Sequence, residues 1–136
     1  MDIAEYFKNV NAQQQINKLA KKFNNKSIVI YGAGEYFNIL NSNYDLSKLN
    51  IVGICDKKFE MDKNANQTNF PTLIPSELKT YNYDVILVAL LQDITICNYI
   101  ESHILINTKN ENKQVIPIIE PNLLYLLKVL LGIVHE

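Results

Sequence analysis

The stretch Ser27-Ile28-Val29-Ile30-Tyr31-Gly32-Ala33-Gly34 decides the fold of this chain. Its first five residues are almost continuously apolar, as expected of a strand that is buried on both faces of a parallel sheet. The glycine-rich turn follows at once, and residues 35–41 then have a helical pattern. A strand that passes through glycines into a helix is typical of the opening unit of nucleotide-binding α/β folds.

The pattern of that unit continues along the chain. Further apolar runs predict strands at 51–55, 84–91 and 114–119, with helices at 76–81 and 92–105, an exposed loop at 56–70 and a very short extended piece at 71–75. Strands that alternate with helices favour a parallel sheet covered on both faces. We therefore predict an α/β domain, half of a doubly wound Rossmann-like fold, with four parallel strands in the order 3-2-1-4.

The two ends of the chain are predicted to be helical. Residues 2–24 carry two apolar stripes that are out of phase, which predicts a break near Asn9–Ala12. The last helix should begin with Pro121 and end just before Gly132. It is apolar on every side, so it must be buried or meet a partner. We expect a homodimer, or docking to a longer enzyme, through Leu123–Val134.

These patterns divide the chain into an N-terminal helical segment, a Rossmann-like domain and a hydrophobic C-terminal helix, at residues 1–25, 26–119 and 120–136. The last segment is interrupted by Pro121 and Glu120 and falls short of the about 20 apolar residues that a membrane span needs. No membrane span is therefore predicted.

Composition narrows the partners and the compartment. The 136 residues suit a single domain, and a net charge of −1 gives no general attraction to nucleic acid. All 13 basic residues are lysines, so a bidentate guanidinium clamp on phosphate does not exist here. Cys55 and Cys97 lie in apolar stretches without a CxxC partner, and the acidic N-terminus has no apolar signal core. Both features favour a cytoplasmic protein with free thiols.

Three features converge on the carboxyl edge of the predicted sheet, where open α/β sheets bind their ligands. The Gly32–Gly34 turn offers backbone amides at a helix start, Asp56 ends the second strand 22 residues after Gly34, and Ala89–Leu91 ends the third strand. Amides suit a phosphate, and an aspartate at this spacing suits ribose hydroxyls. The candidate cofactor-binding residues are Gly32, Ala33, Gly34, Glu35, Tyr36, Asp56, Lys57, Ala89 and Leu90.

The site departs from the dinucleotide fingerprint at two positions. Phe37 occupies the place of the third glycine, which implies either a shifted helix or a ring inserted near the pocket. Glu35 is a carboxylate beside the expected phosphate and would repel it. The turn can therefore also be a tight strand-to-helix connection without a ligand.

Motifs in a fixed order give the chain a resemblance to a known family. They are Ile28–Tyr36, Val52–Asp56, Pro71 with Ile74–Leu78, and Tyr83–Ala89. Over residues 26–92 the chain resembles the Rossmann-like domain of bacterial surface-polysaccharide enzymes, including sugar-nucleotide epimerases and dehydratases and domains attached to FkbM-type methyltransferases. The resemblance implies NAD or a nucleotide sugar at Gly32, Ala33, Gly34 and Asp56, and a role in glycan assembly. The family commonly has glycine where this chain has Phe37.

The sequence contains no catalytic constellation. His103 and His135 lack ligand-spaced cysteines or carboxylates, so no metal site is predicted, and Tyr36 and Cys55 fit packing roles better than chemistry. Three hypotheses remain: a nucleotide- or nucleotide-sugar-binding module without catalysis of its own, a ligand-free interaction or oligomerisation domain, and a fragment of an NAD-dependent sugar-nucleotide enzyme.

Overall fold

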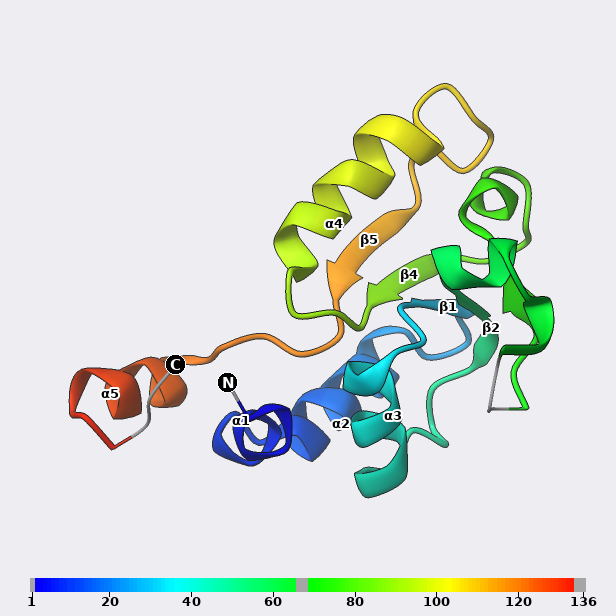
Figure 1. The fold of residues 1–136 in the computed structure, drawn as a ribbon. Coiled ribbons are helices and arrows are strands. Elements are labelled where there is room, and N and C mark those ends of the chain that lie inside the picture. Colours follow the sequence, from blue (N-terminus) through cyan, green and yellow to red (C-terminus); the bar gives the residue numbers. More distant parts are fainter. Residues whose placement is uncertain (1, 66–68, 134–136) are drawn as a thin grey trace.

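The computed structural model describes residues 2–65 and 69–133. Val134 and His135, and part of the predicted 56–70 loop, lie outside these residues. One sheet of five parallel strands forms the centre of the molecule, in the order β3-β2-β1-β4-β5 (Figure 1). Its strands are β1 (Ile28–Tyr31), β2 (Ile51–Cys55), β3 (Thr72–Leu73), β4 (Val85–Val88) and β5 (Gln114–Pro117).

The α/β class and the parallel sheet are confirmed, but the predicted four strands in the order 3-2-1-4 are wrong. The extended piece at 71–75 contributes β3, which pairs with β2 at the edge of the sheet. The apolar run at 84–91 contains β4, the fourth strand, which pairs with β1 on its other side. A strand of two residues has no periodicity, so the sequence pattern does not reveal it.

Helices cover both faces of the sheet. They are α1 (Ile3–Asn9), α2 (Ala12–Lys22), α3 (Glu35–Asn43), α4 (Asp93–Tyr99) and α5 (Leu123–Leu130), with 3₁₀ turns η1 (Lys57–Glu60), η2 (Lys63–Ala65) and η3 (Pro75–Lys79) and a π-helical segment η4 (Ile100–Leu105). Helices α1, α2 and α3 lie on one side of the sheet and α4 on the other (Figure 1).

The alternation of side chains along β1 explains the two layers. Ile28 and Ile30 belong to the core beneath α1, α2 and α3. Val29 and Tyr31 belong to the core beneath α4 and η4. Because successive side chains of a strand point to opposite faces, a strand buried on both faces must be apolar throughout.

Three helical expectations agree with the structure. The break predicted near Asn9–Ala12 separates α1 from α2, with Asn11 between them in the left-handed region at φ 54°. The helix predicted at 35–41 is α3, which extends two residues further. The helix predicted at 92–105 is formed by α4 and η4 together.

The C-terminal helix starts later than predicted. Pro121 is not its first residue, because Asn122 is the N-cap and its side chain accepts a hydrogen bond from the backbone N–H of Tyr125 at 2.8 Å. Asparagine is among the strongest N-cap residues, which fixes the start at Leu123. Gly132 lies just past the end at φ 73°, as predicted. Among the described residues, no helix is long and apolar enough to cross a membrane.

Candidate functional site

Gly32 makes the chain turn sharply at the end of β1. Its φ is 118°, a backbone conformation that residues with a side chain rarely adopt. Its N–H donates a hydrogen bond to the carbonyl of Cys55 at 2.8 Å. A Cβ at this position would lie 2.6 Å from the carbonyl oxygen of Ala89, where β4 ends. Gly32 is therefore required by the protein itself, whether or not a ligand binds.

Gly34 is under no such requirement. It is the N-cap of α3 with φ −97° and ψ −154°, an extended conformation that any residue adopts. A Cβ added there would meet no atom within 4 Å, and no side chain caps this end of the helix. The first N–H groups of a helix have no partner within it. The surface at Gly34 thus combines an open space with backbone donors.

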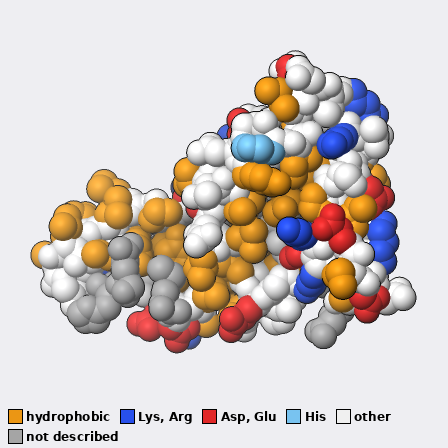
Figure 2. All heavy atoms as spheres, turned by 45° about the horizontal axis from the view of Figure 1, so that its top comes forward, with side chains coloured by type: hydrophobic (Ala, Val, Ile, Leu, Met, Phe, Trp, Pro, Cys, Tyr) orange, Lys and Arg blue, Asp and Glu red, His pale blue; other side chains and the backbone are white. Residues whose placement is uncertain are grey.

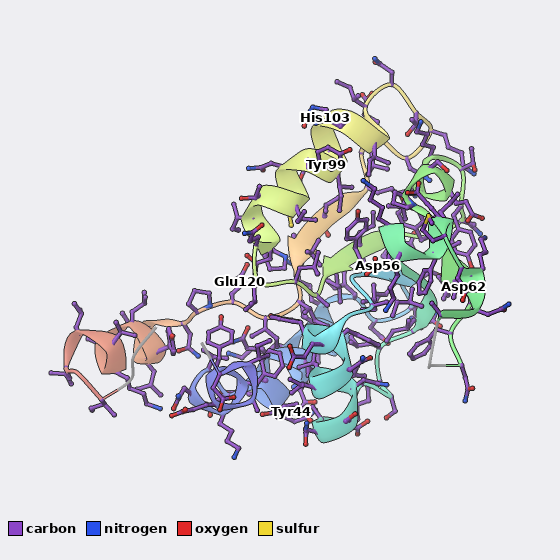
Figure 3. The ribbon with its side chains drawn as sticks, in the orientation of Figure 1. Tyr44, Asp56, Asp62, Tyr99, His103 and Glu120 are labelled. Carbon is purple, nitrogen blue, oxygen red and sulfur yellow. The ribbon has the colours of Figure 1, made fainter. Side chains whose placement is uncertain are left out.

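Asp56 holds the turn from the end of β2. One carboxylate oxygen, Oδ2, accepts from the N–H of Ala33 at 2.8 Å, and Oδ1 accepts from the N–H of Lys58 at 2.9 Å. The ammonium of Lys58 donates to the carbonyl of Ala33 at 2.6 Å. Both backbone polar groups of Ala33, its N–H and its carbonyl, are therefore bound within the protein. Figure 3 shows Asp56 beside the chain that leads from β1 into α3.

This arrangement changes what the predicted residues offer a ligand. The N–H of Ala33 already has an acceptor, so a phosphate would depend on Gly34 and the first turn of α3. A carboxylate has about four lone-pair sites. Two lone-pair sites of the Asp56 carboxylate accept the N–H groups of Ala33 and Lys58. The remaining sites can accept hydrogen bonds from ribose hydroxyls.

A surface depression of about 390 Å³ lies beside the turn. It is lined by Ile3, Glu35, Tyr36, Leu90, Leu91, Gln92 and Ile96. These residues come from the segment between β4 and α4 and from the helices α1, α3 and α4. Between β1 and β4 the chain reverses the direction in which it adds strands, and α/β sheets bind ligands at this switch point. Most of the lining is apolar.

The electrostatics around the depression are acidic. Glu35 begins α3, and Asp93 begins α4 one residue after Gln92. Burial raises the pKa of the Asp93 carboxyl above its usual range. Burial also raises the pKa of the Tyr36 hydroxyl, since this side chain is only 4% exposed. A phenol so reluctant to ionise fits the predicted packing role.

The predicted site residues are only partly brought together. Glu35, Tyr36 and Leu90 line the depression, whereas Ala33 and Asp56 hold each other at the neighbouring turn. Ala89 is fully buried and presents its carbonyl to Gly32, and Lys57 is exposed.

The departure at Phe37 has a simple outcome. Its ring is fully buried in the core, with the ring of Phe70 at 6.4 Å, and does not line the depression. Of the two expectations, the inserted ring is therefore wrong. The side chain fills space between α3 and the sheet.

Sequence reasoning missed several residues of the site. Lys58, rather than its neighbour Lys57, reaches the turn. Ile3, Gln92 and Ile96 line the depression as well, beside Leu91, which the sequence had placed at this edge. The position of Gln92 directly after the apolar run at 84–91 was a usable signal. Ile3 had none, since it comes from the other end of the chain.

Neither cysteine nor His103 lines the depression. Cys55 and Cys97 are buried, and burial raises the pKa of the Cys97 thiol to about 11 and that of Cys55 further. His103 stacks on Tyr99 with ring centroids 4.8 Å apart on the outside of α4 and η4 (Figure 3). In the part of the chain that the structure describes, no three His, Cys, Asp or Glu residues are placed to hold a metal ion.

Comparison with known proteins gives one match. A family model described as C2185-like, N-terminal, matches residues 24–116, which include all five strands except the last residue of β5. No curated protein and no solved structure matches the chain. The match covers more than half of the 136 residues and contains both the glycine turn and the depression. The chain belongs to the C2185-like, N-terminal family.

Proposed function

We propose that the chain is a binding module for a nucleotide or a nucleotide sugar, with NAD as one candidate, and has no catalysis of its own. The observation that carries the proposal is the open space at Gly34, a position where nothing in the protein demands glycine. In dinucleotide-binding folds a glycine at this place lets the backbone approach a pyrophosphate closely.

The ligand is expected to lie across the carboxyl edge of the sheet. Its phosphate meets the backbone N–H groups at Gly34 and the first turn of α3. A ribose lies toward Asp56, whose remaining lone pairs accept from hydroxyls. The other half of the ligand, a nicotinamide ring or a sugar, occupies the depression beside Leu90 and Ile96.

Charge restricts the ligand further. Glu35 and Asp56 are acidic and exposed or half-buried at this edge, and no arginine exists in the chain. An additional phosphate on the ribose would meet the Asp56 carboxylate, so NAD should bind more tightly than NADP. A role in surface-polysaccharide synthesis rests on the sequence resemblance alone and stays a prediction, as does a cytoplasmic location.

The first experiment is thermal unfolding with NAD, NADP, S-adenosylmethionine and common nucleotide sugars. A ligand at 100 times its dissociation constant stabilises the folded state by about 2.7 kcal/mol, which raises the midpoint by several degrees. Gly34→Val should abolish the shift because its side chain fills the open space, while the unliganded protein unfolds as before.

The matched control is Lys109→Ala. Lys109 is exposed in the connection that precedes β5, at the opposite edge of the sheet. This variant should retain the full shift. A shift that survives Gly34→Val would place the ligand elsewhere, and no shift with any compound would contradict the proposal.

One observation favours the second hypothesis, a ligand-free interaction domain. Asp56 and Lys58 bind the backbone N–H and carbonyl of Ala33, as an empty turn requires. Under this hypothesis Gly34→Val leaves all properties of the protein unchanged. An NAD-dependent enzyme fragment has less support, since no acid or base with a suitable partner faces the depression among its lining residues.

A further inference from the structure

The segment 123–133, which begins with α5, carries the largest set of exposed aliphatic side chains in the described part of the chain. Figure 2 shows these side chains gathered on a lobe that projects from the body of the molecule. The exposed fractions are 74% for Leu123, 49% for Leu124, 47% for Leu126, 46% for Leu127, 81% for Leu130, 73% for Leu131 and 69% for Ile133. We call these seven residues the α5 face.

The helix is held in place from its other side. Tyr125 is 1% exposed, and its ring lies edge-on to that of Tyr6 with centroids 5.2 Å apart. The side-chain N–H of Asn122 donates to the carbonyl of Val10 at 3.0 Å. The α5 face is therefore presented on an anchored helix, and its exposure is a property of the folded chain.

The geometry of the helix makes the face continuous. At about 100° per residue, the six leucines of the α5 face cover an arc of roughly 160° around the helix axis. Tyr125 lies on the opposite side, and Lys128 lies at the margin of the arc. Leu123, Leu126 and Leu130 repeat at the spacing of a helix–helix seam.

The area of the face matches that required by a pair of identical chains. The exposed fractions are together equivalent to about four fully exposed aliphatic side chains, on the order of 500 Å² of apolar surface. Monomeric proteins rarely leave so large an apolar patch in contact with water. Two such faces bury about 1,000 Å² in total, the lower limit for a specific interface.

We propose that a second copy of this chain covers the α5 face, with the two α5 helices antiparallel about a twofold axis near Leu126 and Leu127. A twofold interface must be complementary to itself. A purely aliphatic face meets this condition, whereas a charged one does not. The antiparallel arrangement places the positive N-terminal end of each α5 dipole beside the negative C-terminal end of the other.

The test is the mass of the protein in solution, measured by sedimentation equilibrium over a wide range of concentration. The native chain of 15.6 kDa should double in mass as its concentration rises. Leu127→Asp and Leu130→Asp should each weaken the dimer at least 100-fold and leave the circular dichroism spectrum unchanged. The control is Met61→Asp, because Met61 is 92% exposed and lies outside the face; it should dimerise like the native chain.

Disulfide trapping tests the orientation of the helices. The two native thiols are buried and do not compete. Leu127→Cys should crosslink two copies readily, because it lies near the axis. Leu123→Cys should not, because the antiparallel arrangement separates its two copies by roughly 10 Å along the helices, beyond the reach of a disulfide.

Three results would contradict the proposal or part of it. A native chain that stays monomeric at all concentrations would leave the face to a different partner, such as a longer enzyme. A dimer that persists in Leu127→Asp and Leu130→Asp would lie on another surface. Efficient crosslinking of Leu123→Cys would contradict the antiparallel arrangement. None of these readings depends on whether the Gly34 edge binds a ligand.

Discussion

Two glycines that lie two residues apart in one turn are constrained by different things. Gly32 is constrained by its positive φ and by the carbonyl of Ala89, which leaves no room for a Cβ. Gly34 has an ordinary extended backbone and open space in front of it. The first glycine therefore serves the fold, and the second is available to a ligand.

This difference predicts that the two substitutions change the free energy of unfolding by unequal amounts. Gly32→Ala should lower the free energy of unfolding by about 2–4 kcal/mol, because it combines a strained backbone with a clash. Gly34→Val should stay within about 1 kcal/mol of the native protein, since a weaker N-cap is offset by a less flexible unfolded chain. Urea unfolding followed by circular dichroism measures both values. Equal losses in the two variants would contradict this assignment.

At the scale of elements, the Glu77 carboxylate links two segments beside the edge strand β3. Oε1 of Glu77 in η3 accepts from the N–H of Ile74 at 3.0 Å and from the ammonium of Lys63 in η2 at 2.7 Å. It therefore connects η2 to the segment that follows β3. The two hydrogen bonds lower the pKa of Glu77, the one from Lys63 having the larger effect.

Glu77→Gln should show how this connection depends on pH. Because the folded-state pKa is lowered, the contribution of Glu77 is complete above the unfolded value near 4.5 and is lost as the pH falls below it. The side chains are 50% and 38% exposed, and solvent screens the pair. The variant should lose about 0.5 kcal/mol at pH 7 and less at pH 3, measured by urea unfolding at the two values. An equal loss of stability at both pH values would show that the charge of the Glu77 carboxylate does not contribute to the connection.

At the scale of the whole molecule, the two ends of the chain fold against each other. Gln15 in α2 donates to the carbonyls of Val10 and Glu120 at 3.0 and 2.8 Å, and accepts from the N–H of Glu120 at 2.9 Å. Asn122 adds its bond to the carbonyl of Val10. These segments lie outside residues 24–116, so the helices α1 and α5 form a structure beside the part that defines the family.

Asn122 should control the local stability of α5. Asn122→Ala removes both the N-cap and the bond to Val10, which should cost about 1–2 kcal/mol and speed amide hydrogen exchange throughout α5. Asn122→Asp keeps the cap acceptor but cannot donate to the carbonyl of Val10. Its exchange rates in α5 should therefore lie between those of the native protein and those of Asn122→Ala. Hydrogen exchange followed by mass spectrometry measures the difference. Unchanged exchange in Asn122→Ala would mean that the packing of Tyr125 alone holds the helix.

The sequence by itself determined the α/β class, the four longer strands, the break between α1 and α2 and the position of the glycine turn. These features follow from the periodicity of apolar residues and from the backbone preferences of glycine, which act over a few neighbouring residues. The run of apolar residues in β4 was sufficient because a strand buried on both faces needs apolar side chains at every position.

The tertiary structure decided the rest. The two-residue strand β3 exists only because β2 offers its edge. Asp56 turned out to bind the turn itself, since the fold brings its carboxylate to the N–H of Ala33 across 23 positions of sequence. The depression unites Ile3 with Ile96 for the same reason. Local patterns report which side chains must be buried, whereas hydrogen-bond partners and cavities depend on how distant segments meet.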